Sequence, residues 1–256
     1  MLHDFTKDKF DVIILAGQSN AEGCGLGPVE DPYVPDGRVF HLYPNGTIAQ
    51  AADDTFYNDL RSHFALPFAR EYIRAGMLAE DRKLLILRCA VGGTGFWNNC
   101  WGLADHLYLQ MLDMTRTALD LNPENRLVAL LWHQGEADAL SAASFESYYK
   151  NLSDLLTSVR ETFSAPDLPF VAGDFVQGWK AGFAELCAPV IEATRAVCRD
   201  CGPGGFAETD GLLSNFEELD YHPMGWWESD PIHFSRKAIY ELGKRYFSEF
   251  ERIVTG

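Results

Sequence analysis

Residues 12–20 read VIILAGQSN, an unbroken apolar run that ends at Gly17 and is followed two positions later by Ser19. Continuous apolar runs without alternation are typical of strands in a parallel sheet that is covered on both faces. Three later runs have the same character, at residues 84–90, 127–132 and 169–172. The sequence therefore predicts a mainly parallel sheet whose first strand presents a serine at its carboxyl end.

Segments with helical periodicity separate these runs. Apolar residues recur at spacings of three and four over residues 64–75, 105–119, 144–163, 181–197 and 235–250. Strands that alternate with helices form right-handed βαβ units, so the pattern predicts a three-layer α/β/α sandwich. No internal repeat or low-complexity linker is present, and we expect a single domain over residues 1–256.

Two long stretches show neither pattern. Residues 23–60 contain four prolines and several glycine and aspartate residues, and residues 201–230 are rich in glycine, tryptophan and acidic residues. We expect both to be loops, with a short strand at 38–43 in the first. Loops of this length in a compact domain tend to be functional.

The composition limits the partners of the protein. The formal net charge is −16, which argues against nucleic acid and makes a polyanionic substrate less favourable. No apolar run approaches the ~20 residues of a membrane helix, and the charged N-terminal segment lacks the apolar stretch of a signal peptide. We therefore expect a cytoplasmic protein without nucleic-acid or membrane partners; secretion is the alternative if a leader precedes residue 1. The oligomeric state cannot be predicted.

The six cysteines are scattered, but Cys198 and Cys201 have CxxC spacing. A structural zinc site needs four ligands, and neither a second cysteine pair nor a histidine pair follows nearby. We therefore expect free thiols, no metal site and no cofactor.

Four polar clusters follow the expected strands or precede the last helix: GQSN at 17–20, VGGTG at 91–95, HQGE at 133–136 and DPIH at 230–233. In open parallel α/β sheets, ligands bind beyond the carboxyl ends of the strands. These clusters together contain the groups that an acyl-transfer site requires.

Each group has a chemical role in such a site. Ser19 would be the nucleophile, His233 the base that takes its proton, and Asp230 the acid that orients the imidazole. The oxyanion of the intermediate needs fixed N–H donors. The backbone N–H groups of Ser19 and Gly93 and the side-chain amide of Gln134 are the candidates.

The four clusters resemble the SGNH hydrolase superfamily and, within it, the sialate O-acetylesterase and acetylxylan esterase group, carbohydrate esterase family six. The matching residues are GQSN at 17–20, GGTG at 92–95, WHQGEAD at 132–138 and DPIHFS at 230–235. The resemblance implies a flavodoxin-like sandwich that removes acetyl groups from carbohydrates without a metal. Ser19 and His233 match the nucleophile and base of the family, and Asp230 matches the orienting acid.

The third member of the triad has two candidates. Pro231 and Ile232 separate Asp230 from His233, and Pro231 should stiffen this turn. Glu136 of the HQGE block could reach the same histidine. Adjacency on one turn favours Asp230, which leaves Glu136 a supporting role beside the oxyanion hole.

Several of these residues also have structural interpretations. Ser19 alone could be a helix N-cap, although the combined clusters favour catalysis. Asn20 could cap the following helix or hold the nucleophile loop, and His133 could be structural or contact the substrate. The loop residues Trp97, Trp101, Trp226 and Trp227 could belong to the core or stack on a sugar.

We therefore predict a serine esterase that hydrolyses O-acetyl groups of carbohydrates. The acidic chain favours neutral acetylated xylo-oligosaccharides over O-acetyl sialic acid, which would require a local cation such as Arg61 or Arg88. One alternative is a short-chain lipase or thioesterase of the SGNH type, against which the HQGE block argues. The other is a carbohydrate-binding protein with a relict site, against which the intact Ser-His-Asp set argues.

Overall fold

The computed structural model describes residues 3–56, 59–219 and 230–256. Its centre is a seven-stranded sheet in the order β3-β2-β6-β1-β7-β8-β9. Neighbouring strands are parallel except for β2 and β3. The strands of this sheet are β1 (Lys9–Gly17), β2 (Val39–Leu42), β3 (Ile48–Gln50), β6 (Arg82–Arg88), β7 (Arg126–His133), β8 (Phe170–Gly173) and β9 (Gly204–Ala207).

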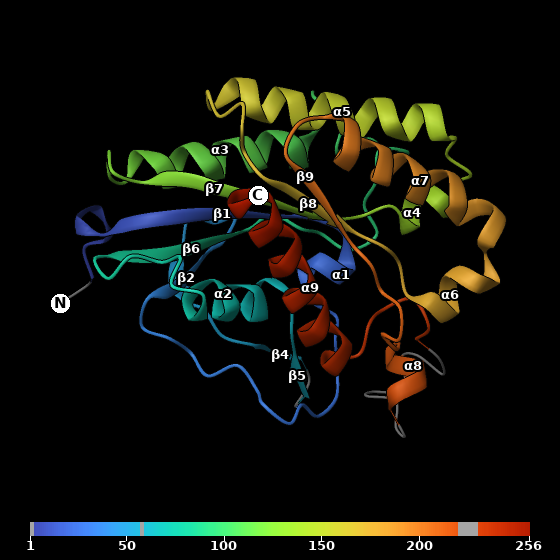
Figure 1. Ribbon diagram of the computed structural model, residues 1–256, viewed down its shortest axis with the longest axis horizontal. Coiled ribbons are helices and arrows are strands. Elements are labelled where there is room, and N and C mark those ends of the chain that lie inside the picture. Colours follow the sequence, from blue (N-terminus) through green and yellow to red (C-terminus); the bar gives the residue numbers. More distant parts are fainter. Residues whose placement is uncertain (1–2, 57–58, 220–229) are drawn as a thin grey trace.

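Helices cover both faces of the sheet (Figure 1). On one face lie α3 (His106–Asp120), α5 (Phe145–Thr162) and α7 (Ala184–Asp200), and on the other lie α2 (Ala65–Arg74) and α9 (Arg236–Thr255). The shorter helices are α1 (Ser19–Glu22), α4 (Glu136–Leu140), α6 (Gln177–Gly182) and α8 (Asn215–Glu218), with a 3-10 turn at Phe5–Lys7. The predicted three-layer α/β/α sandwich with a mainly parallel sheet is confirmed.

The two covered faces explain the apolar runs. Every residue of β1 from Phe10 to Gly17 is buried, because helices pack on both sides of the strand. Serine residues are the N-caps of two of the long helices. The Ser144 side chain accepts a hydrogen bond from Ser147 N at the start of α5, and the Ser235 side chain accepts one from Ala238 N at the start of α9. Among the described residues, no helix has the length and apolar character that crossing a bilayer requires.

The expected loops contain more regular structure than the sequence indicated. The short strand expected at 38–43 is β2, but the same stretch also holds β3 and the first strand of a separate hairpin, β4 (Asp54–Phe56) with β5 (Asp59–Arg61). The expected loop at 201–230 contains β9, whose glycine-rich sequence GGFA carries no strand signal. β9 forms through its pairing with β8, which a local pattern does not predict.

The topology brings the polar clusters together. β1 lies between β6 and β7, and the chain fills the β6 side of the sheet before it crosses to β7. The strand order therefore reverses beside β1, and such switch points form crevices at the carboxyl ends of strands. Gly17 pairs with His133 and Leu15 with Arg88, so the first three clusters leave the sheet at one edge.

Candidate active site

The nucleophile loop begins with a close contact between β1 and β7. Gly17 has φ of 130°, and a Cβ there would overlap the carbonyl oxygen of His133. Gln18 N donates to that same oxygen at 2.9 Å. Only glycine fits this crossing, after which the chain turns directly into α1 with Ser19 as its first residue. Ser19 is therefore held at the carboxyl end of a buried strand.

Ser19, His233 and Asp230 form one chain of hydrogen bonds. His233 Nε2 lies 2.8 Å from Ser19 Oγ, and His233 Nδ1 lies 2.8 Å from Asp230 Oδ1. Because the ionised carboxylate can only accept, Nδ1 carries the proton and Nε2 is the acceptor for the serine hydroxyl. The geometry allows the imidazole to take the Ser19 proton while Asp230 holds its orientation.

Asp230 is kept ionised by its partners. Burial alone would raise its pKa, but hydrogen bonds from the His233 side chain and from Asn215 outweigh burial and hold the pKa below its ordinary value. Asn215 Nδ2 donates to Asp230 Oδ2 at 2.8 Å. Asn215 begins α8, whose start is fixed by a capping box between Ser214 and Glu217.

The backbone N–H groups of Ser19 and Gly93 are candidates for binding an oxyanion, and Gly92 positions the turn that carries Gly93. Gly92 N donates to Glu22 Oε2 at 2.7 Å, and a Cβ on Gly92 would lie 3.5 Å from Ser19 Cβ. This contact places the turn against the nucleophile. Gly93, with φ of 71°, follows in open space. Within the described part of the chain, neither Ser19 N nor Gly93 N donates to a protein acceptor.

The side chain of Gln134 does not fit its expected role. Its Nε2 donates to Gln18 Oε1 at 3.2 Å, to Thr94 O at 3.1 Å and to Asp138 Oδ2 at 2.6 Å. Its Oε1 accepts from Tyr148 OH at 2.8 Å. The expectation that Gln134 is an oxyanion donor is therefore corrected. The N–H groups of its buried amide donate to residues of the first three polar clusters and join these clusters to one another.

Asp138 supports the loop that carries Gly93. Its carboxylate accepts from Phe96 N at 3.1 Å and from Trp97 N at 2.9 Å, in addition to Gln134. Burial raises the pKa of Asp138, and these three hydrogen bonds oppose the rise. Asp138 is the last residue of the block WHQGEAD at 132–138, but its role depends on contacts with residues about 40 positions away.

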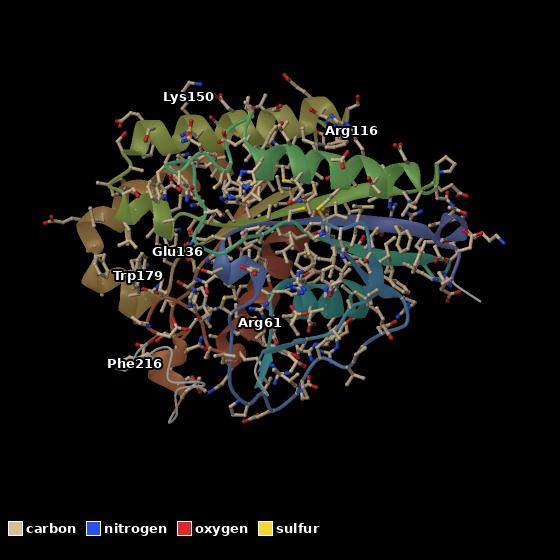
Figure 2. All side chains as sticks on the ribbon, turned by 180° about the vertical axis from the view of Figure 1, so that it is seen from behind. Arg61, Arg116, Glu136, Lys150, Trp179 and Phe216 are labelled. Atoms are coloured by element: carbon tan, nitrogen blue, oxygen red, sulfur yellow. The ribbon has the colours of Figure 1, made fainter. Side chains whose placement is uncertain are left out.

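Asn20 and Glu136 form a buried pair beside the nucleophile loop, and within the part of the chain that the structure describes neither forms a hydrogen bond to the Ser19 hydroxyl. Asn20 Nδ2 donates to Glu136 Oε1 at 2.7 Å, and Glu136 is fully buried at the start of α4 (Figure 2). Of the two open interpretations, Asn20 holds the nucleophile loop, because Gln18 is the N-cap residue of α1. His133 is buried, with Nδ1 against Tyr246 OH at 2.9 Å, which is a structural position.

The four tryptophans that could stack on a sugar differ in their positions in the structure. Trp97 is 55% exposed and remains a candidate for sugar stacking. Trp101 is corrected to a core residue: its side chain has no exposed surface, its Nε1 donates to Thr94 Oγ1, and it packs edge-on against Trp132. Trp226 and Trp227 lie outside the described residues, and their proposed role stays a prediction.

A cavity of about 410 Å³ opens above Ser19. His233 and Gly93 line it together with the apolar residues Leu26, Leu140 and Ile232, which the sequence did not single out. Arg61 also lines this cavity. Arg88 donates hydrogen bonds to Asp54 and to the carbonyl oxygen of Glu22. Arg61 is the last residue of β5 and is labelled in Figure 2.

The cysteines do not form a metal centre in the described residues, where no group of three or more potential ligands is close enough to hold a metal ion. Cys198 is buried near the end of α7, and burial raises its pKa to about 12. Cys24 lines the cavity above Ser19, and burial likewise raises its pKa to about 12. Neither thiol is therefore set up as a reactive thiolate.

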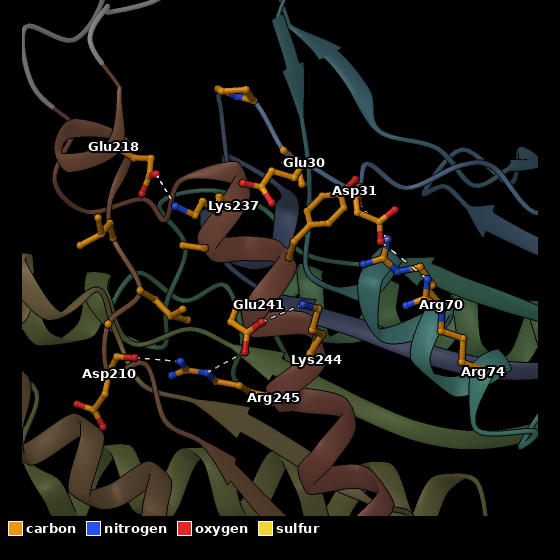
Figure 3. Close-up of a pocket in the computed structure, with 17 residues that line it drawn as sticks. Glu30, Asp31, Arg70, Arg74, Asp210, Glu218, Lys237, Glu241, Lys244 and Arg245 are labelled. Atoms are coloured by element: carbon orange, nitrogen blue, oxygen red, sulfur yellow. Dashed lines mark hydrogen bonds and ion pairs between the residues drawn. The ribbon is translucent and has the colours of Figure 1, made fainter.

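A larger cavity of about 960 Å³ lies between α2, α9 and the loops at 28–31 and 210–213 (Figure 3). Ser19 and His233 are not among the described residues that line it. Many of its charged side chains pair with each other: Arg70 with Asp31, Lys237 with Glu218, and Lys244 with Glu241. The groups suited to chemistry gather in the smaller cavity.

A parallel α/β/α sandwich that presents serine, histidine and aspartate in one hydrogen-bonded chain is typical of an SGNH-type hydrolase. Comparison with known proteins agrees. The model of the family described as "Carbohydrate esterase, sialic acid-specific acetylesterase" matches residues 9–252. The chain therefore belongs to this family, and the resemblance inferred from the four clusters is confirmed.

Individual relatives give the same result. The chain is 34% identical to a probable carbohydrate esterase of Arabidopsis thaliana over 93% of this chain and 91% of that protein. It is 25% identical to a probable 9-O-acetyl-N-acetylneuraminic acid deacetylase of Escherichia coli over 69% of this chain and 70% of the relative. Family and relatives identify the chain as a carboxylic-ester hydrolase of the carbohydrate acetylesterase class.

Solved structures confirm the fold. The crystal structure of NanS superimposes with a TM-score of 0.79 at 19% identity, over 96% of this chain and 98% of that one. The structure of an Arabidopsis thaliana protein superimposes with a TM-score of 0.74 at 20% identity, over 94% and 98%. At these sequence identities, the structural similarity shows that the fold is shared but gives no information about the substrate.

Proposed function

We propose that the protein removes acetyl groups from carbohydrates through a Ser19-His233-Asp230 triad. The observation that carries the proposal is the continuous chain of hydrogen bonds from Asp230 through His233 to Ser19, which ends in a cavity. A serine hydroxyl becomes an effective nucleophile only when a positioned base takes its proton. The 2.8 Å length of both bonds supports such a transfer from Ser19 to His233.

The reaction proceeds through an acetyl-enzyme. Ser19 Oγ forms a bond to the acetyl carbon as His233 Nε2 takes the hydroxyl proton, and the carbonyl oxygen becomes an oxyanion. The N–H groups of Ser19 and Gly93 bind this oxyanion; removing one such donor costs about 2.7–4 kcal/mol in other hydrolases. The ester bond to the sugar oxygen then breaks as His233 returns the proton to that oxygen. Water, activated by His233, releases acetate and restores Ser19.

The substrate class divides between neutral and acidic sugars. The net charge of −16 favours acetylated xylo-oligosaccharides, as the sequence indicated. Arg61 in the cavity supports an acidic sugar instead, because a guanidinium pairs with a carboxylate through two parallel hydrogen bonds. The name of the bacterial relative points the same way. We propose that a local cation outweighs the distributed charge and that an O-acetylated acidic sugar is the better substrate.

Acetate release from a substrate panel tests this proposal. The panel contains O-acetylated N-acetylneuraminic acid, acetylated xylo-oligosaccharides and a nitrophenyl ester series from acetate to octanoate. We expect the highest kcat/KM on the acidic sugar ester and falling activity beyond the acetyl group. Activity that rises with chain length supports a lipase or thioesterase, and sugar binding without acetate release supports a relict site. Either result contradicts the proposal.

A further inference from the structure

Asn20 holds the backbone on both sides of the base. Its Oδ1 accepts from Phe234 N at 3.1 Å, and its Nδ2 donates to Ile232 O at 3.1 Å. His233 lies between these two residues, so one amide fixes the turn that directs the imidazole toward Ser19. Because Asn20 also follows Ser19 in the chain, it joins the nucleophile to the base.

Glu136 determines the orientation of that amide. Its Oε1 accepts the second N–H of Asn20 Nδ2 at 2.7 Å. An Asn20 amide rotated by 180° would place its oxygen against this carboxyl oxygen and its NH₂ group against Phe234 N–H. The correct orientation therefore requires an acceptor on Glu136, whose side chain has no exposed surface.

The carboxyl oxygen that accepts from Asn20 also lies near a nitrogen that needs a donor. His133 Nε2 lies 3.8 Å from Glu136 Oε1. Tyr246 OH donates to Trp132 O at 2.8 Å, so it accepts from His133 Nδ1 and leaves Nε2 with a lone pair. Among the described residues, neither His133 Nε2 nor Glu136 Oε2 has a hydrogen-bond partner, although both are buried.

We propose that Glu136 keeps its proton at neutral pH and acts as a neutral positioning residue, with its C=O toward Asn20 and its O–H toward His133 Nε2. Without this proton, the Glu136 carboxylate and His133 Nε2 would be two buried acceptors with no donor between them, and each would carry a desolvation penalty. The 3.8 Å between Oε1 and Nε2 is too long for a direct hydrogen bond, so the O–H reaches Nε2 through one buried water. The kinetic consequence rests on the proposed esterase function, whereas the protonation does not.

The surrounding groups favour this location of the proton. Burial raises the pKa of Glu136; the hydrogen bond from Asn20 opposes the rise, and the charge of Asp174 adds to it. Burial lowers the pKa of His133 to about 3, so the proton of this pair belongs on the carboxyl. A neutral Glu136 cannot replace Asp230, whose ionised carboxylate holds His233 Nδ1.

Substitutions at Glu136 test the positioning role. In Glu136→Gln, the amide oxygen accepts from Asn20 and the NH₂ group donates toward His133, so we expect kcat within about threefold of the wild type. Glu136→Ala removes the acceptor, and we expect kcat to fall about 100-fold with little change in KM, as for a misplaced catalytic group. A Glu136→Gln loss as large as that of Asp230→Asn overturns the proposal, because it shows that the charge of Glu136 is required.

Infrared spectroscopy tests the protonation without a substrate. The difference spectrum of wild type minus Glu136→Gln at neutral pH should contain the C=O band of a protonated carboxyl that shifts in D₂O. Glu146→Gln, which alters an exposed residue of α5, should give no such band. Loss of carboxylate bands in Glu136→Gln overturns the proposal. If no ester is hydrolysed at all, the proposed function fails while this spectrum still decides the protonation.

Discussion

Two carboxyl groups near Ser19 have opposite environments. Asp230 accepts hydrogen bonds from His233 and Asn215, and its pKa is lowered despite burial. Glu136 is buried with one such bond, and its pKa is raised. Environments that push two pKa values apart separate the roles of chemically similar groups. In the proposed mechanism, the charged carboxylate of Asp230 orients His233, and the Glu136 carboxyl holds the loop that carries Asn20.

Asp230→Asn should lower kcat by roughly 10⁴-fold, because the amide favours the wrong tautomer of His233 and does not stabilise the imidazolium. The measurement is steady-state acetate release at neutral pH. Asp167→Asn, at an exposed position, is the matched control and should leave kcat unchanged. A loss of less than about tenfold in Asp230→Asn would mean that another acid orients His233.

Glu136 should also make stability depend on pH. Its folded-state pKa is raised above the ordinary value of 4.5, so above about pH 4.5 the folded state binds more protons than the unfolded state. The free energy of unfolding then falls as pH rises toward the folded pKa, by up to about 1.4 kcal/mol per pH unit. Glu136→Gln removes this slope.

The measurement is Tm between about pH 5 and about pH 8, where linkage acts. The Tm of Glu136→Gln relative to wild type should rise across this range. A difference that stays constant with pH would contradict a raised pKa of Glu136.

At the scale of elements, the turn after β6 is as important as the nucleophile turn. Gly93 has φ of 71°, and a Cβ there would meet no neighbour within 4 Å. The only penalty for Gly93→Ala is therefore the left-handed backbone conformation, about 1–2 kcal/mol. A turn that relaxes to avoid this strain moves the Gly93 N–H away from the oxyanion.

Gly93→Ala should lower both the free energy of unfolding and kcat, measured by chemical denaturation and acetate release. Gly37→Ala is the control, since its Cβ would also meet no neighbour and its φ lies outside the left-handed region. Equal effects of the two substitutions would show that the conformation of Gly93 has no role in catalysis.

The elements also show which features can be predicted from sequence. The strands β1, β6, β7 and β8 and the five long helices carry strong local patterns and were predicted. Asn215 was missed, although the capping box of Ser214 and Glu217 is visible in the sequence and marks a helix start. Gln134 and Trp101 were misassigned because their partners, Asp138, Thr94 and Trp132, are set by tertiary packing. A sequence motif indicates which residues lie close together, but it does not indicate which of their hydrogen-bond donors remain available to bind a substrate.

At the scale of the whole molecule, the net charge of −16 opposes the approach of an anionic sugar, and the proposed function requires Arg61 in the cavity to offset this repulsion. Salt screens the repulsion by the distributed surface charge more than the interaction with Arg61 inside the cavity, because exposed charges are screened over about 8–10 Å near physiological ionic strength. The assignment of the full chain to one domain and its cytoplasmic location stay predictions.

The KM for an O-acetylated acidic sugar should therefore fall as salt rises from low to physiological concentration, while the KM for acetylated xylo-oligosaccharides stays constant. Arg61→Gln should raise the KM for the acidic ester and leave that for the neutral ester unchanged. A change of equal size for both esters would remove Arg61 as a determinant of specificity.

The proposed mechanism requires that Ser19 becomes acetylated during turnover. The most direct measurement is acetate release from O-acetylated N-acetylneuraminic acid by wild type and by Ser19→Ala, with the mass of rapidly quenched enzyme recorded in parallel. We predict steady release and one added acetyl group in the wild type, and neither in a folded Ser19→Ala variant. Acetate release by Ser19→Ala at the wild-type rate would show that Ser19 is not the nucleophile.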